Sequence, residues 1–251
     1  MMVANEITIK LDDSFTAQVC DYSVGFLRFG MDGRFEIAEP VGTGTFVKLG
    51  RVYGIMTAAH VLTSLDFKSM IGLVRFPSVN PALQNRRLNL QYTENILDWN
   101  KKEGDAPDIG FLKIPEQDGR AIEATGAIFY NLETIREFAA GNPHNSMCTC
   151  HAVVGVVAEW TEKVNADIKV GSKINVGGLF CAAKNPRFLS EGNAAITEVE
   201  VDHANGLRIP TSYGGVSGGA LWKLFVEVDA KHMPVRVNKR LVGVAFRQSD
   251  D

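Results

Sequence analysis

Short runs of alternating apolar and polar residues, bounded by glycine, proline and other turn-forming residues, recur along the whole chain. Such period-two patterns are typical of β-strands with one buried face. Helical periodicity is scarce and is confined to a turn after His60 and to residues 132–140. Residues 75–102 and 141–146 carry proline and asparagine, and we expect loops there. The pattern therefore predicts an all-β protein, with strands over residues 24–29, 42–49, 52–58, 71–76, 108–114, 152–160, 196–201, 219–228 and 241–246.

One interruption of this pattern suggests a division of the chain. A strand-like run closes at Pro115, the polar sequence EQDGR follows, and alternation resumes near Ala127. The chain has 251 residues, which is enough for two ordinary domains. We therefore expect a boundary near residue 120, between an N-terminal domain of residues 1–120 and a C-terminal domain of residues 121–251.

Composition and charge narrow the class of protein. Hydrophobic residues make up 45% and charged residues 22% of the sequence, as in ordinary water-soluble globular proteins. The 26 lysines and arginines nearly balance the 29 aspartates and glutamates, giving a formal net charge of -3 without a long run of one sign. Nucleic acid is therefore not a favoured partner. No stretch reaches the roughly 18 apolar residues that a membrane-spanning helix needs, so no membrane partner is expected.

The N-terminal sequence and the cysteines indicate the compartment. The sequence MMVANEITIKLDDSF lacks the charged start and apolar core of a secretory signal peptide. The 4 cysteines, Cys20, Cys148, Cys150 and Cys181, are too few and too irregularly spaced for a disulfide framework. We therefore expect a cytoplasmic protein with free thiols.

A glycine-rich segment carries the first candidate for chemistry. In YGGVSGGAL, Ser217 lies between Gly215 and the pair Gly218 and Gly219. Glycines allow the backbone to turn sharply and to expose the hydroxyl. The backbone N–H groups of Gly215 and Ser217 would then be two donors for an oxyanion. Taken alone, the segment is equally consistent with an ordinary β-turn.

His60 and Asp108 are the candidates for activating this hydroxyl, because a nucleophilic serine needs a neighbouring base that an acid holds in one tautomer. In IMTAAHVL, a strand-like run ends in small residues just before His60. Asp108 opens an alternating run whose apolar positions are expected to be buried. Three rival acids are interpreted as solvated loop residues: Asp98, Glu103 and Asp105. The remaining histidines are expected on the surface or in loops: His144, His151, His203 and His232.

These segments resemble the signature of chymotrypsin-like serine proteases, because GTGTFV, TAAHVL, DIGFLKI and GGVSGGALW occur in the order that the family uses. The resemblance implies a serine endopeptidase that hydrolyses peptide bonds through an acyl-enzyme. Ser217 would be the nucleophile, His60 the general base and Asp108 the residue that orients the histidine. The resemblance also implies two packed six-stranded Greek-key β-barrels with the active site between them. The first would carry His60 and Asp108, and the second Ser217 and the substrate pocket.

Comparison with the family pattern refines this expectation. Val216 stands where zymogen-type members carry an acid, so we expect activity without N-terminal cleavage. By counting, the resemblance places the base of the substrate pocket at Thr211 and one wall along Val244, Ala245 and Phe246. Because Thr211 is uncharged, cleavage after lysine or arginine is not expected. The polypeptide substrate should instead carry a neutral residue before the cleaved bond.

Other functions remain open. A catalytically silent scaffold or binding module, gated by a regulatory protein partner, would keep the same fold, and an esterase would use the same triad. No phosphate-binding loop, zinc-protease helix or dinucleotide fingerprint occurs, so no cofactor is expected. The run Cys148-Thr149-Cys150-His151 invites a metal site. In a strand, however, its side chains alternate between faces, so core packing is preferred and no metal is expected.

Overall fold

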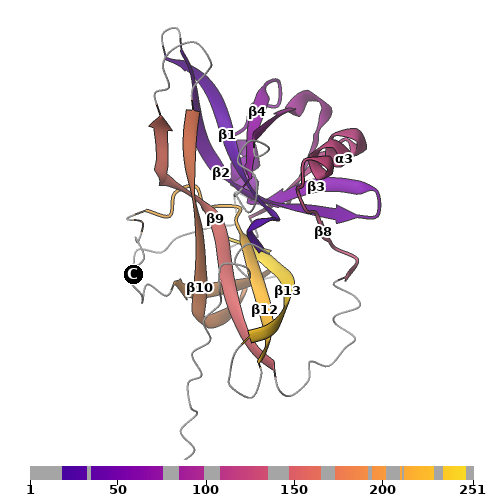
Figure 1. The fold of residues 1–251 in the computed structure, drawn as a ribbon, viewed down its shortest axis with the longest axis vertical. Helices are drawn as coiled ribbons and strands as arrows, with labels where there is room; N and C mark the ends of the chain where they lie inside the picture. The colour runs from indigo at the N-terminus through magenta and orange to yellow at the C-terminus, as the bar shows by residue number, and fades with distance from the viewer. Residues whose placement is uncertain are drawn as a thin grey trace, which may run out of the picture.

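The computed structural model describes residues 19–32, 35–75, 85–98, 108–134, 147–164, 173–191, 194–201, 210, 212–228 and 234–246. This part of the chain is mainly β-structure, arranged as a larger and a smaller sheet. Figure 1 shows the indigo and purple strands of the larger sheet in the upper part of the view and the yellow strands of the smaller sheet in the lower part. The prediction of a mainly β protein is confirmed.

The larger sheet contains 8 strands and is curled like half a barrel. They are β1 (Ser23–Asp32), β2 (Phe35–Leu49), β3 (Val52–Thr57), β4 (Met70–Arg75), β5 (Asn85–Asn89), β6 (Glu94–Asp98), β7 (Ile109–Ile114) and β8 (Tyr130–Asn131). Neighbouring strands follow the order β5-β4-β1-β2-β3-β7-β6, and each of these pairs is antiparallel. The short β8 pairs with β2 in parallel.

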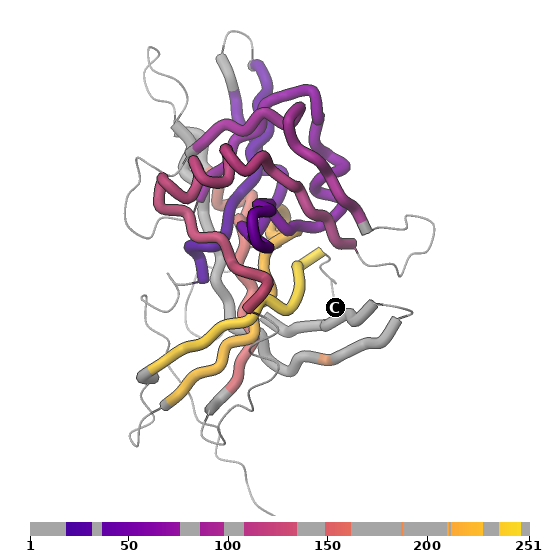
Figure 2. Tube along the Cα trace, turned by 90° about the vertical axis from the view of Figure 1, so that its right-hand side faces the viewer, coloured from indigo at the N-terminus to yellow at the C-terminus, as the bar shows by residue number. Residues whose placement is uncertain are grey.

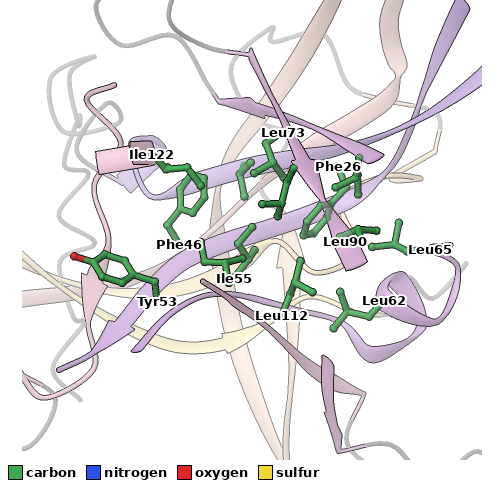
Figure 3. Packing of buried hydrophobic residues seen from close by; sticks show 14 of the residues in the cluster. Phe26, Phe46, Tyr53, Ile55, Leu62, Leu65, Leu73, Leu90, Leu112 and Ile122 are labelled. Atoms are coloured by element: carbon green, nitrogen blue, oxygen red, sulfur yellow. The ribbon is translucent and has the colours of Figure 1, made fainter. Parts of the chain in front are cut away.

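The core of the larger sheet follows from the alternation of its strands. Along β7, Leu112 and Ile114 are buried while Ile109 and Lys113 are exposed. Figure 3 shows Leu112 in the same apolar cluster as side chains from several other strands. Leu62, which follows β3 in the segment that carries the candidate histidine, belongs to this cluster and is fully buried. Burying a leucine contributes roughly 1.5–3 kcal/mol, so the core fixes this segment in place.

The smaller sheet contains 5 antiparallel strands in the order β11-β10-β9-β12-β13. They are β9 (Met147–Val164), β10 (Lys173–Glu191), β11 (Ala194–Val201), β12 (Ala220–Val228) and β13 (Pro234–Val244). In Figure 2, turned by 90°, the yellow strands β12 and β13 extend away from the indigo-to-magenta trace of the larger sheet. The two sheets are therefore distinct, because in the described residues no strand of one pairs with a strand of the other.

An apolar cluster joins the two sheets. Val47 of β2 and Tyr130 of β8 pack in one cluster with Val154 and Trp222 of the smaller sheet. The ring of Trp222 lies 5.2 Å from that of Tyr130 and 5.4 Å from that of Tyr22, measured between centroids. Such aromatic pairs contribute about 0.5–1.5 kcal/mol beyond their buried area. Packing thus holds the sheets against each other.

Two of the helical segments show where the sequence pattern succeeded and failed. The turn predicted after His60 is confirmed as α2 (Ala59–Thr63). The helix α3 (Glu116–Ala124) was not predicted; only one face of it is buried, through Gly119 and Ile122, so it leaves little apolar signal. The boundary expected near residue 120 falls within α3, and the chain passes to the smaller sheet only after β8.

The expectation of a loop over residues 75–102 is wrong in part. Its described portion contains β5, the short 3-10 helix η2 (Leu90–Tyr92) and β6. Of the candidate helix over residues 132–140, residues 135–140 lie outside the described part of the chain. None of the helices in the described ranges has the length and apolar character needed to cross a membrane.

Candidate functional site

His60 and Asp108 meet because the strands that carry them are neighbours. β3 ends at Thr57, and β7 begins just after Asp108; Thr57 lies opposite Gly110 in the antiparallel register of the two strands. His60 then lies in the first turn of α2, where backbone N–H groups have no partner within the helix. Asp108 supplies those partners: its carbonyl oxygen accepts from Ala59 N over 3.3 Å, and its carboxylate Oδ1 accepts from His60 N over 2.9 Å.

The other carboxylate oxygen binds the imidazole ring. Asp108 Oδ2 is hydrogen-bonded to His60 Nδ1. Because a carboxylate only accepts, Nδ1 must carry the proton, which leaves Nε2 of the neutral ring as an acceptor. The Asp108 side chain is 11% exposed and the His60 side chain 39% exposed. The pair therefore presents an oriented, solvent-accessible base.

The segment Ser212–Gly219 forms a tight loop before β12. Val216 N donates to Tyr213 O over 3.0 Å, and Gly219 N donates to Val216 O over 2.8 Å. Gly215 and Gly218 have φ values of +90° and +83°, which favour glycine. A Cβ at Gly218 would overlap Thr57 Oγ1 and Thr43 O. The loop that carries Ser217 is thus pressed against the end of β3, next to the helix that carries His60.

The two predicted oxyanion donors are the backbone N–H groups of Gly215 and Ser217. The carbonyl before each of them is held: Gly214 O accepts from Ala158 N over 2.8 Å, and Val216 O accepts from Gly219 N. In a trans peptide the N–H points opposite to the carbonyl, so both donors are directed away from these contacts. Among the described residues, neither N–H group has a hydrogen-bond partner.

Thr43, on β2, belongs to this site although the sequence analysis did not select it. Its side chain is fully buried. The hydroxyl donates to Gly215 O over 2.7 Å and accepts from Val156 N over 2.7 Å. Its backbone N donates to Ser217 O over 2.8 Å. In the sequence, Thr43 falls within GTGTFV, one of the segments that carry the family resemblance, but that segment does not single out its hydroxyl.

The hydrogen bond between the proposed nucleophile and the proposed base is not formed in this structure. The Ser217 hydroxyl and the His60 ring, both among the described residues, are not joined by a hydrogen bond. In enzymes without substrate, catalytic hydrogen bonds are often long and tighten only in the complex. The two side chains nevertheless come from segments in direct contact, through Gly218 and the end of β3.

The predicted pocket residues behave differently from one another. Ala245 lies beside the loop, because its O accepts from Gly218 N over 2.6 Å and its N donates to Gly219 O over 2.8 Å. Val244 pairs with Ala220 as β13 ends. Phe246 instead packs against the core of the larger sheet. Thr211 lies outside the described residues.

The rival acids and the suggested metal run supply none of the hydrogen bonds to His60 that the structure describes. Asp98 ends β6 opposite Ile109, and Glu103 and Asp105 lie outside the described residues. On β9, Cys150 packs against the apolar cluster that joins the two sheets. The next residue, His151, has a pKa below its ordinary value, because burial and, to a smaller extent, the charge of Lys223 lower it. Within the described ranges, no three histidine, cysteine or acidic side chains are gathered as metal ligands would be.

Comparisons with known proteins give no family for this chain. None of the protein-family models matches the sequence, and the search of curated proteins finds no similar one.

Proposed function

We propose that this protein is a serine endopeptidase that resembles the chymotrypsin-like family. One observation carries the proposal: the Asp108 carboxylate binds both the ring and the backbone of His60, beside a glycine loop with two unengaged N–H groups. An acid, an oriented base, a serine and paired donors are the components that acyl transfer by serine requires.

In the proposed mechanism, Ser217 Oγ attacks the carbonyl carbon of a peptide bond while His60 Nε2 accepts the hydroxyl proton. The carbonyl oxygen becomes an oxyanion that accepts hydrogen bonds from Gly215 N and Ser217 N. His60 then gives its proton to the leaving amine as the C–N bond breaks, and an acyl-enzyme remains on Ser217. Water hydrolyses this ester by the same two steps, with His60 again as the base.

The same proposal extends to the finer fold and the substrate. We infer that the two sheets correspond to two six-stranded Greek-key barrels with the active site between them, and the curl of the larger sheet supports this. The substrate would be a polypeptide with a neutral residue before the cleaved bond, since Thr211 is uncharged. A crystal structure with a bound peptidyl inhibitor tests both statements.

Activity without N-terminal cleavage is part of the proposal. Val216 is 6% exposed and packs with Val153, Val157 and Leu221, so apolar packing supports the loop where zymogen-type relatives would use an ion pair. Purified chain with an intact Met1 should therefore already react. Activity that appears only after N-terminal trimming would contradict this part.

A fluorophosphonate probe tests the nucleophile without knowledge of the substrate. We expect mass spectrometry to locate the adduct on Ser217, and Ser217→Ala or His60→Ala to abolish it. Ser64→Ala is the matched control, because Ser64 is an exposed serine whose hydroxyl only donates to Val61 O. Absence of labelling in the folded chain would favour the silent scaffold. Labelling with turnover of esters but not of peptides would favour the esterase.

A further inference from the structure

Thr43 occupies an unusual position between the two sheets. It lies on β2 of the larger sheet, yet its hydroxyl contacts Gly215 of the loop and Val156 of β9 in the smaller sheet. Its carbonyl oxygen accepts from Thr57 Oγ1 over 2.6 Å, at the strand end before α2. One buried residue thus connects the loop around Ser217, the smaller sheet and the segment that leads to His60.

The hydroxyl of Thr43 bridges a gap in the smaller sheet. The pairing of β9 with β12 ends at Val154, opposite Ala220, so Val156 N has no partner on β12. The hydroxyl accepts a hydrogen bond from this N–H and donates one to Gly215 O. A hydroxyl can do both at once because it has one donor and two acceptor positions. A methyl group in its place could do neither.

This contact controls the direction of a proposed oxyanion donor. Gly215 has a φ of +90°, in a region where glycine rotates with little steric restraint. The peptide plane before it is held by the bond from Ala158 N to Gly214 O. The plane after it is held at both ends, by the bond from Thr43 Oγ1 to Gly215 O and by the bond from Val216 N to Tyr213 O. Without the Thr43 bond, that plane keeps only the Val216 bond, so Gly215 has more freedom to turn and to move its N–H away from the oxyanion position.

Thr45 provides a comparison within the same strand. It lies two positions from Thr43 on the same face of β2, and both residues are 0% exposed. The Thr45 hydroxyl has no hydrogen-bond partner. This face of β2 therefore accommodates a threonine whose hydroxyl has no partner. The Thr43 hydroxyl differs from it by its hydrogen bonds to Gly215 O and Val156 N.

We propose that Thr43 is a positioning residue whose hydroxyl holds Gly215 so that its N–H faces the oxyanion. The inference rests on the proposed function. Since removal of a direct oxyanion donor costs about 10²–10³-fold in rate, loss of the residue that positions one should cost roughly tenfold or more. The loss should fall on the acylation step and leave the His60–Asp108 pair intact.

The test compares Thr43→Val, Thr43→Ser and Thr45→Val in the rate of fluorophosphonate labelling at Ser217. We expect Thr43→Val to react at least roughly tenfold more slowly, and the other two variants to stay within about threefold of the parent chain. The low-field proton resonance of His60 Nδ1–H should persist in all variants. If Thr43→Val does not fold, Thr43→Ala removes the same hydroxyl with less steric demand.

Two results would overturn the positioning role. One is labelling of Thr43→Val at the parent rate; the other is an equal loss in Thr45→Val, which would indicate general packing. Amide exchange of Val156 separates this inference from the proposed function, because its N–H binds the Thr43 hydroxyl. If the parent chain is not labelled but exchange at Val156 accelerates in Thr43→Val and not in Thr43→Ser, the protease proposal fails while the anchoring contact stands. Unchanged exchange would refute the contact itself.

Discussion

The His60–Asp108 pair and the loop around Ser217 are held in place by different means. The pair lies at one end of the larger sheet, between α2 and the start of β7, where one carboxylate binds the ring and the backbone of the histidine. The loop lies between the sheets and is held mainly by backbone hydrogen bonds and by glycines that leave room for neighbouring atoms. The first arrangement depends on side-chain charge, and the second on backbone shape.

The two parts should therefore be sensitive to different kinds of substitution. A substitution that keeps the shape but removes the charge should damage the His60–Asp108 pair and leave the fold intact. Around Ser217, an added methyl group should do more harm than a lost charge, because the loop contacts its neighbours through main-chain atoms.

Asp108→Asn should have the largest effect on reactivity. The amide keeps the shape of the carboxylate and one oxygen that can accept from His60 N, but it removes the charge that stabilises a protonated ring. We expect labelling of Ser217 to slow by roughly 10³–10⁴-fold, with little change in unfolding free energy. Asp66→Asn is the control, since Asp66 is an exposed acid that accepts from Lys68 N. Labelling of Asp108→Asn at the parent rate would remove Asp108 from the mechanism.

Gly218→Ala should have the largest effect on stability. The new methyl group would overlap Thr57 Oγ1 and Thr43 O, and the φ of +83° adds backbone strain. We expect a loss of about 3 kcal/mol or more in urea denaturation. Gly50→Ala separates the two causes, because Gly50 has a φ of +58° but the nearest atom to its added Cβ, Glu133 Oε1, would be 4.0 Å away. Strain alone should cost about 1–2 kcal/mol there. Equal losses in the two variants would mean that close packing contributes nothing.

The same contrast explains what sequence reasoning could anticipate. The strands of the core have strict alternation, as in Ile109–Ile114, and were predicted. β10 was missed because Gly177, Gly178 and Pro186 interrupt its pattern, and its pairing shifts register in their neighbourhood. β5 was missed because its sequence NRRLN is largely polar and it joins the sheet through backbone pairing with β4.

Within the candidate site, local sequence motifs identified some residues, whereas others depend on contacts between distant parts of the chain. Short motifs in the sequence identified the three residues whose proposed roles depend on their side chains: His60, Asp108 and Ser217. Thr43 acts through contacts with residues 113 and 172 positions away in the chain, which no local pattern encodes. Phe246, which the family resemblance places at the pocket wall, is partly buried against the core of the larger sheet; counting along the chain gives its position but not the direction of its side chain.

Glu123→Gln tests a contact of the larger sheet that plays no part in the proposed chemistry. Lys48 Nζ and Tyr53 OH each donate to the Glu123 carboxylate over 2.7 Å. Burial raises the pKa of Glu123, but these hydrogen bonds outweigh it and hold the pKa below its ordinary value of 4.5. We expect the variant to lose about 1 kcal/mol of unfolding free energy at pH 7 and to label at the parent rate.

The pH dependence of this loss has a definite sign. Because folding lowers the pKa of Glu123, its contribution is fully present above the pKa of the unfolded chain and disappears as the pH falls through the folded-state value. The difference between the parent and Glu123→Gln should therefore shrink towards zero as the pH falls below 4.5 and through the folded-state pKa of Glu123. Glu116→Gln is the control on the same helix, since its pair with Arg120 is exposed. A difference that persists at low pH would assign the loss to packing.

Thr45→Val should have the smallest effect and gives the sharpest contrast with Thr43. Valine has nearly the same shape as threonine, and the Thr45 hydroxyl is buried without a partner, so the substitution removes a desolvated polar group and breaks no hydrogen bond. We expect unfolding free energy to stay the same or to rise by up to about 1 kcal/mol, whereas Thr43→Val should lose about 1–3 kcal/mol. A clear loss in Thr45→Val would mean that its hydroxyl has a partner in solution. High-resolution crystallography should seek that partner near Ser23, which lies opposite Thr45 in the register of β1 and β2 and whose buried hydroxyl also has no partner.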